Sequence, residues 1–450
     1  MMFDARSIAI ATGGRIVHEG ASGPIGTDSR RVAGGSWFVA LTGDRFDGHD
    51  YLPHAAAAGC AGAVVSREPA GWTRGLVVVD NTLVALQDLG RAARSRFHGP
   101  TVAITGSAGK TSTRVMVVDV LASLGKVHHT HGNLNNHIGV PLTLVATPLD
   151  ADALVLEMGM NHPGEIMLLQ DIGSPTVRLV TNVGAAHVEG CGSIVGVARA
   201  KQELFDGARE GDVVCVNVDD PFVAAMPIPA GTRVITYGRA PHASVRLTDV
   251  VVDGVRLQTR LRIETPEGSV LATLAVPGAH LAVNAAAATA VAFALRVPLE
   301  AVGPALSRFE PDGMRNRVER IGGAAVLDDA YNANPTSMMA GLATLSSLPG
   351  RRVAVLGDML ELGSAEVEAH AQVLDSALAA GIEWVLVTGA RMARAAEERP
   401  GVRVFADVDA ISDALIGELR IGEGDALLVK GSRGAKMERV VERLRAARST

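Results

Sequence analysis

The chain has 450 residues, of which 48% are apolar, and a formal net charge of −6. A chain of this length is too long for a single hydrophobic core and suits two to four domains. Its sequence nowhere shows the run of about 20 apolar residues that a membrane-spanning helix needs. An acidic balance without a basic run, and only 3% aromatic residues, argues against nucleic acid as the main partner. Three widely spaced cysteines and a start without an apolar leader favour a reducing compartment. We therefore expect a cytoplasmic monomer that acts on small molecules.

The α/β fold class is predicted, with three domains at 1–98, 99–312 and 313–450. The smaller N-terminal domain is rich in Gly and Asp turns. The central domain alternates short apolar strands with helices, which is typical of a parallel sheet with helices on both faces, here of the P-loop type. Within it, 243–277 reads as antiparallel strands and 280–295 as a long helix. The C-terminal domain returns to the same alternation and is expected to be Rossmann-like.

The strongest local signal is VAITGSAGKTS, where an apolar strand runs through a glycine-rich loop into a helix. Glycines let backbone N–H groups surround a phosphate, and the helix N-terminus adds positive potential. In such a loop the lysine reaches the terminal phosphates and the following hydroxyl a magnesium ion. The loop is shorter than the usual pattern, but its context predicts nucleotide binding. The residues concerned are Gly106, Ser107, Ala108, Gly109, Lys110, Thr111 and Ser112.

Arginine supplies most of the positive charge, since only five of the 42 basic residues are lysines. One of them, Lys201, shares a predicted helix face with Val197 and Phe205. Spacing leaves two interpretations open. The amine snorkels to water, or it is buried with a lowered pKa and reacts as a neutral amine with carbon dioxide to form a carbamate.

Other polar residues stand where strands are expected to end. Glu157 follows ALVL, and His187 lies a few residues after RLVT. Because ligands gather at the carboxyl ends of parallel strands, this carboxylate and imidazole predict a magnesium site near the loop. Further candidates lie in THGNLNNHIGVP, VLDDAYNANP and LLVKGSRGAKM, for each of which a solvated turn is the alternative. They are Asn133, Asn135, Asn136, Asp329, Tyr331, Asn332, Lys430 and Ser432.

With these residues in place, the chain resembles the Mur ligase family of ATP-dependent amide-forming enzymes. The loop TGSAGKTS is similar to the family's TGTNGKT[ST], and further motifs match in order along most of the chain. They are GNLNNHIGVPLTL, LEMGMNHPGEI, TNVGAAHVEGCGS, AKQELF, LDDAYNANPTSM and LGDMLELG. Two positions depart from the family pattern: Ala108 stands where an asparagine is frequent, and Leu281 replaces an asparagine that often follows the histidine of GxHNxxN.

The resemblance implies roles for individual residues. Thr111 and Glu157 would contact one Mg²⁺ and His187 a second, while Lys201 matches the family's carbamylated lysine, which supports the second ion. The UDP-sugar end of the substrate would contact Ser29, Arg30, Asp47 and His49. The nucleotide would contact Asn284, Arg317, Asp329, Tyr331 and Asn332. Arg317 is preferred to Arg315 because Val-Glu-Arg follows it. Lys430 and Ser432 would help to place the incoming amine, and the three asparagines of the amide-rich loop would contact substrate.

DDAYNANP and LGDMLELG are most similar to the family branch that joins D-alanyl-D-alanine to UDP-N-acetylmuramoyl-tripeptide. In the implied reaction, the tripeptide carboxylate attacks the γ-phosphate of ATP, and the dipeptide amine then displaces phosphate from the acyl phosphate. Lys110, Lys201, His187 and Glu157 are the implied catalytic residues. Three alternatives remain at this point: a relative that adds the third amino acid, a folylpolyglutamate synthase, and a P-loop NTPase switch. The last would leave Glu157, His187 and Lys201 without a role.

Overall fold

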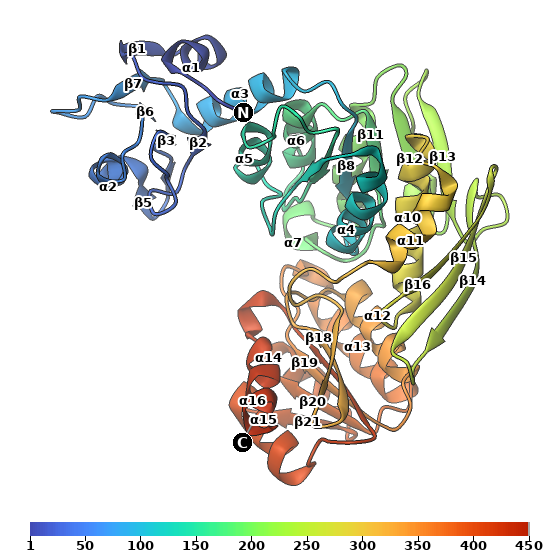
Figure 1. Ribbon diagram of the computed structural model, residues 1–450. Coiled ribbons are helices and arrows are strands. Elements are labelled where there is room, and N and C mark those ends of the chain that lie inside the picture. The colour runs from blue at the N-terminus through green and yellow to red at the C-terminus, as the bar shows by residue number, and fades with distance from the viewer. Residues whose placement is uncertain (449–450) are drawn as a thin grey trace. The chain divides into compact units, whose positions relative to one another are not determined.

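The computed structural model describes residues 1–448, which form two compact units. The first unit comprises Met1–Ala103, Leu124–Gly159 and Glu165–Thr176. The second comprises Ile104–Ser123, Met160–Gly164 and the chain from Val177 onward. Both alternate helices with strands (Figure 1), in agreement with the α/β prediction. Among residues 1–448, no helix combines the length and the apolar character that a membrane span requires.

The N-terminal part of the first unit is a five-stranded sheet in the order β1-β7-β6-β3-β2. Only β1 runs antiparallel to its neighbour. The strands are β1 (Arg15–His18), β2 (Ile25–Gly26), β3 (Trp37–Val39), β6 (Gly62–Val65) and β7 (Gly75–Val78), with a separate short pair, β4 (Thr42–Gly43) and β5 (Phe46–Asp47). The helices are α1 (Ala5–Thr12), α2 (Leu52–Ala57) and α3 (Thr82–Ser95).

The rest of the first unit contains a parallel strand pair and two helices that pack against α3. The strands are β9 (Val127–His129) and β10 (Ala153–Glu157), and the helices are α5 (Gly139–Val145) and α6 (Glu165–Gly173). All five residues of β10 are buried. A continuous apolar strand of this kind is typical of a sheet that is covered on both faces.

The second unit contains a run of parallel strands, β11 (Val177–Val180), β12 (Val213–Asn217) and β13 (Arg233–Gly238). The N–H of Thr181 donates to the carbonyl of Thr105 over 2.9 Å, which sets the end of β8 (Thr101–Thr105) beside β11. Three longer strands extend this sheet, with β15 antiparallel to both of its neighbours. They are β14 (Val245–Asp253), β15 (Gln258–Thr265) and β16 (Gly268–Leu274). The antiparallel segment predicted for 243–277 is thus confirmed.

Helices of this part include α4 (Lys110–Leu121), which follows the glycine-rich loop, and α10 (Ala279–Ala294), which packs along α4. Alanines fill most of α10, and twelve of its residues are buried. Small side chains let two helix backbones approach closely, so α10 brings its polar Asn284 up to the loop. The other helices are α7 (Val188–Cys191), α8 (Ile194–Asp206), α9 (Pro221–Ala224) and α11 (Leu299–Ser307).

A six-stranded sheet in the order β17-β18-β22-β19-β20-β21 forms the C-terminal part of the second unit. Only the edge strand β17 is antiparallel to its neighbour. The strands are β17 (Arg317–Ile321), β18 (Ala324–Asp329), β19 (Arg351–Gly357), β20 (Trp384–Thr388), β21 (Val402–Phe405) and β22 (Asp425–Lys430). The helices are α12 (Pro335–Ser346), α13 (Glu366–Ala379), α14 (Ala390–Ala396), α15 (Val408–Asp413) and α16 (Glu438–Arg448).

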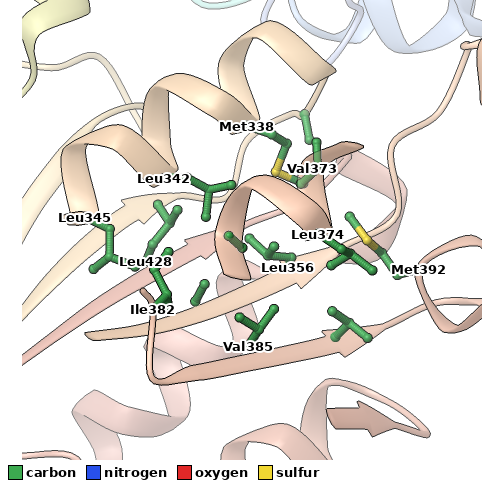
Figure 2. Packing of buried hydrophobic residues seen from close by; sticks show 14 of the residues in the cluster. Met338, Leu342, Leu345, Leu356, Val373, Leu374, Ile382, Val385, Met392 and Leu428 are labelled. Carbon is green, nitrogen blue, oxygen red and sulfur yellow. The ribbon is translucent and has the colours of Figure 1, made fainter. Parts of the chain in front are cut away.

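Successive side chains of these strands enter two separate cores. On β20, Val385 and Val387 face α12, α13 and α14, whereas Leu386 faces α15 and α16. Figure 2 shows the first of these cores, in which Leu342 of α12 and Leu374 of α13 lie over the sheet. Alternation with a period of two places apolar residues on both faces, as a doubly wound sheet requires. The Rossmann-like arrangement predicted for this part is therefore present.

Candidate active site

Two glycines give the phosphate loop its shape. Gly106 has φ +150°, and a Cβ there would lie 1.8 Å from the Thr181 hydroxyl oxygen. Gly109 has φ +80°, and a Cβ there would lie 2.8 Å from the side-chain oxygen of Asn284. Only glycine combines these backbone angles with such close neighbours. The loop therefore turns tightly, and it brings the predicted nucleotide residue Asn284 to its surface.

Helix α4 begins at Lys110, directly after the loop. The N–H groups of a first helical turn have no partner within the helix and carry partial positive charge. Lys110 Nζ donates to the Gly106 carbonyl over 2.6 Å, which keeps the ammonium group on the loop. Thr111 and Ser112 are buried beside it. This strand, loop and helix together form a site that suits a phosphate.

Lys201 lies within α8 and is only 1% exposed. The amine therefore does not snorkel to water. Burial, together with the charge of Lys110, lowers the pKa of Lys201 well below its usual range. A deprotonated lysine amine is a nucleophile, whereas an arginine at this position would stay protonated.

His187 is held by a glutamate that the sequence did not single out. The residue has φ +60° at the start of α7, and its Nδ1 lies 2.6 Å from Oε2 of Glu361. At this distance the imidazole and the carboxylate are close enough for an ion pair, but the His187 Nδ1 does not meet the angle required of a hydrogen bond. It lowers the pKa of Glu361. With Nδ1 facing Glu361, Nε2 is the imidazole nitrogen that points elsewhere and suits a ligand.

Arg315, rather than Arg317, meets the phosphate loop. The Arg315 guanidinium donates to the Thr111 hydroxyl, and its carbon lies 4.0 Å from the ring centre of Tyr331, within the range of a cation–π contact. Arg317 is exposed on β17, paired in register with Asp328. The proposed nucleotide role of Arg317 stays a prediction, and Arg315 is the arginine with the geometry for it.

The other residues of the C-terminal candidate site form an internal network. Lys430 is 1% exposed and donates to Asp329 Oδ2 over 2.5 Å and to the Asn332 carbonyl over 3.0 Å. The N–H of Asn316 donates to the other Asp329 oxygen over 3.1 Å. By contrast, the buried Ser432 hydroxyl has no hydrogen-bond partner among residues 1–448. An unpartnered buried hydroxyl is costly unless a water or a ligand satisfies it. The contact of Ser432 with a ligand stays a prediction.

The first unit holds Glu157 and the amide-rich loop. Glu157 is 1% exposed at the end of β10, and its carboxylate accepts from Asn135 Nδ2 over 2.9 Å. Asn136 is used differently, because its side chain accepts the N–H groups of Ile138 and Gly139 and so closes the turn before α5. Asn133 is exposed. Of the three asparagines, Asn135 is the one that orients a candidate site residue.

The N-terminal candidates divide into exposed and internal groups. Arg30 is exposed and pairs with Asp28, whose pKa it lowers. His49 is buried: Nδ1 lies 2.6 Å from Asp47, and Nε2 accepts the N–H of Ser66 over 3.0 Å. Both ring nitrogens are thus engaged within the protein. Ser29 and Arg30 lie in an accessible turn and stay predicted substrate contacts, whereas the ring of His49 is engaged inside the protein.

Three domain profiles match the chain in sequence order. They are the Mur ligase catalytic domain at residues 24–94, the Mur ligase middle domain at 104–292 and the Mur ligase glutamate ligase domain at 315–433.

Curated relatives match over almost the whole chain. UDP-N-acetylmuramoyl-tripeptide–D-alanyl-D-alanine ligase of Escherichia coli is 38% identical over 93% of this chain and 92% of its own length. The enzyme of that name from Bacillus subtilis is 34% identical over the same shares.

Solved structures agree with this. MurF from Acinetobacter baumannii has a TM-score of 0.92 at 30% identity and covers 99% of each chain. MurF from Thermotoga maritima in complex with ADP has a TM-score of 0.85 at 27% identity, over 95% of this chain and 98% of that one. Folylpolyglutamate synthase from Mycobacterium tuberculosis, at 19% identity and a TM-score of 0.64 over 80% of this chain and 93% of its own, shares the fold alone. The three matched domains, the full-length relatives and the phosphate loop beside a buried lysine lead to one conclusion: the chain belongs to the Mur ligase family.

Proposed function

We propose that the chain is the ATP-dependent ligase that joins D-alanyl-D-alanine to UDP-N-acetylmuramoyl-tripeptide, with release of ADP and phosphate. One observation supports this choice of substrates above all: a ligase with this name is 38% identical over 93% of the chain, which includes the regions that would bind each substrate. The phosphate loop and the buried Lys201 support ATP-driven activation of a carboxylate. The reaction makes a peptide bond for a peptidoglycan precursor.

Lys110 and the start of α4 would bind the ATP phosphates. The tripeptide carboxylate attacks the γ-phosphorus, the bond to the ADP oxygen breaks, and an acyl phosphate forms. The amine of the dipeptide then attacks the acyl carbon, loses a proton, and phosphate leaves. Catalysis of such a transfer is mostly positioning and neutralisation of charge, which Lys110, the helix start and Arg315 supply.

The residues present fit magnesium as a companion of ATP. In the second unit, the Thr111 hydroxyl offers an oxygen of the kind that Mg²⁺ prefers and His187 offers Nε2. Glu157, in the first unit, stays a ligand that the resemblance implies. Nowhere in residues 1–448 do three or more His, Cys, Asp or Glu side chains gather into a metal-binding group. Mg²⁺ keeps water and phosphate oxygens as most of its ligands. When bound, the ion neutralises charge on the transferred phosphoryl group.

Lys201 would act as a carbamate. Its neutral amine forms a bond to the carbon of carbon dioxide and loses a proton, which gives a carboxylate on a buried side chain. Burial supports this, because it lowers the amine pKa and keeps the group away from bulk water. The new carboxylate would add a hard oxygen ligand for a second magnesium ion.

The acceptor site is proposed around Ser432, whose buried hydroxyl lacks an internal partner in the part of the chain that the structure describes. The UDP end of the other substrate is proposed to contact Ser29 and Arg30. We expect His49 to act indirectly, since its ring is engaged by Asp47 and Ser66.

Release of ADP by the purified chain tests the function. The assay contains ATP, Mg²⁺ and UDP-N-acetylmuramoyl-tripeptide, with D-alanyl-D-alanine present or absent. We expect ADP release to need both substrates, and the product mass to equal tripeptide plus dipeptide minus water. A requirement for glutamate or for a single amino acid would favour another amide ligase of the family. ATP turnover that needs no amine would favour a nucleotide switch.

A further inference from the structure

One peptide of the phosphate loop is held at both polar atoms by asparagine side chains. The peptide joins Ser107 to Ala108. Its carbonyl oxygen accepts from Asn334 Nδ2 over 3.1 Å, and its N–H donates to Asn182 Oδ1 over 2.9 Å. Asn182 and Asn334 are called the asparagine pair below. Because the carbonyl and the N–H of one peptide point in opposite directions, two such bonds fix the rotation of its plane.

Asn182 belongs to the sheet beneath the loop. It follows β11, and besides accepting from the Ala108 N–H it donates through Nδ2 to the Ala108 carbonyl over 3.0 Å. The Thr181 hydroxyl donates to that same carbonyl over 2.7 Å. The loop residue itself is an alanine, so no side chain of its own can brace this turn. The bracing comes from the end of β11.

Asn334 belongs to the C-terminal part of the second unit and uses its amide twice. Oδ1 accepts the N–H of Ser337 over 2.9 Å and thereby caps α12, while Nδ2 donates to the loop. The two halves of one amide therefore tie the start of α12 to the phosphate loop. No other residue type with a side chain of this length offers both an acceptor and a donor.

Contacts around the pair support the same junction. A Cβ on Gly184 would lie 2.2 Å from the Thr336 hydroxyl oxygen, so the first turn of α12 lies directly on the segment after Asn182. The Ser107 hydroxyl donates to the Gly184 carbonyl over 3.1 Å. Loop, β11 end and α12 start thus meet at one peptide.

We propose that Asn334 is a positioning residue for the nucleotide site. Together with Asn182 it orients the Ser107–Ala108 peptide, and so sets the path by which the loop enters α4 and presents its N–H groups to phosphate. The inference rests on the proposed ATP-binding function and adds a dependence of nucleotide affinity on the start of α12. The capping role alone would give no such dependence.

The test separates the two uses of the amide. Asn334→Ser and Asn334→Asp both retain a good helix cap, because Ser, Asp and Asn cap helices about equally well. Both lose the donor to Ser107. We expect both variants to have melting temperatures close to that of the wild type. Asn334→Ser should raise the Kd for ADP about 3- to 10-fold, because it loses about one hydrogen bond. Asn334→Asp should weaken binding further, because its carboxylate faces a carbonyl oxygen and the phosphates.

Calorimetric titration of the full chain with ADP gives the Kd. In the ligase assay, the KM for ATP should rise, whereas kcat at saturating ATP should change less. Asp407→Ala is the matched control, because Asp407 caps α15 over 2.8 Å and lies in no proposed site. It should lower the melting temperature and leave the Kd for ADP unchanged. Stable Asn334 variants that bind ADP as tightly as the wild type would overturn the inference, as would equal weakening by Asp407→Ala. Wild-type protein that binds neither ADP nor ATP would overturn the proposed function itself.

Discussion

At the scale of single residues, the two buried lysines, Lys201 and Lys430, differ in whether a carboxylate lies beside the amine. Lys201 has no carboxylate among the causes of its lowered pKa, which are burial, Lys110 and an opposing effect of Cys191. Lys430 is equally buried but is paired with Asp329 over 2.5 Å. A buried amine without a counter-ion is expensive as a cation. Lys201 is therefore the lysine for which the fold favours the neutral form.

Replacement of Lys201 tests its role directly. Lys201→Met keeps an unbranched side chain but removes the amine, so no carbamate can form. We expect ligation to fall by roughly 10²-fold or more, as when a group that stabilises transition-state charge is removed, while the Kd for ADP stays within a few-fold because the loop is untouched. Added bicarbonate should not restore activity. Full ligase activity in this variant would remove the carbamate from the mechanism.

We expect opposite results for KM when the two arginines at the start of the C-terminal part, Arg315 and Arg317, are replaced. Arg315→Ala should raise KM for ATP about 10- to 100-fold, because it loses a charge-assisted contact worth roughly 1.5–3 kcal/mol at Thr111. Arg317→Ala should change KM for ATP less than twofold, since its side chain is exposed on β17. Steady-state kinetics on both variants decide between them. The reverse order would restore Arg317 as the nucleotide contact.

The sequence could not choose between these arginines for a physical reason. Asn316 lies between them with φ +53°, which turns the chain so that its neighbours point differently from residues in a regular strand. Its conformation is held by distant groups: the Asn316 N–H donates to Asp329, and its side chain lies 3.0 Å from His280 Nε2. The pairing of His187 with Glu361 is equally non-local. The glycines of the loop and the carboxylate at the end of β10, in contrast, are predicted from neighbouring residues. Spacing alone leaves Lys201 between snorkelling and burial, and the structure buries it.

At the scale of helices and strands, apolar runs were predicted well where both faces are buried. Apolar runs in the sequence predict strands at 213–217 and 384–388, and β12 and β20 have these limits. The sequence predicts a further strand at 178–182. β11 ends at Val180, because Thr181 and Asn182 leave the strand to contact the phosphate loop. The sequence predicts no strand at β17, since three of the five residues in RVERI are charged and the strand pairs only at the sheet edge. The predicted domain limits stay predictions.

One ion pair stands at the end of the pairing of β18 with β22. Asp329 and Lys430 stand opposite each other in register, and Lys430→Met would leave the largely buried carboxylate of Asp329 without its counter-ion. Breaking one partner of such a pair costs about 3–5 kcal/mol. We expect chemical denaturation to show a loss of that size, with Lys430→Arg losing much less.

If Lys430 also places the dipeptide, KM for D-alanyl-D-alanine should rise in Lys430→Arg even though stability is kept. An unchanged KM in that variant would limit Lys430 to its structural role.

At the scale of the whole molecule, nucleotide candidates occur on both parts of the second unit. Asn284 stands at the loop, and Tyr331 lies on the C-terminal part under Arg315. An acyl phosphate must be kept from water, so we expect the C-terminal part to close further over the nucleotide during the reaction. Small-angle scattering with ATP and UDP-substrate should give a smaller radius of gyration than without them. Identical curves would contradict this closure.

The position of β22 has a consequence for how the protein is made. This strand is the last in the chain, yet it lies between β18 and β19 in the middle of its sheet. A nascent chain on the ribosome can therefore not complete this sheet until residue 430 has emerged, because β18 and β19 have no other strand to bridge them. Non-local pairing of this kind slows folding and leaves strand edges exposed in the meantime. Translation stopped before Asp425 should consequently yield a protein whose C-terminal part is open to proteases, however well its earlier strands are formed.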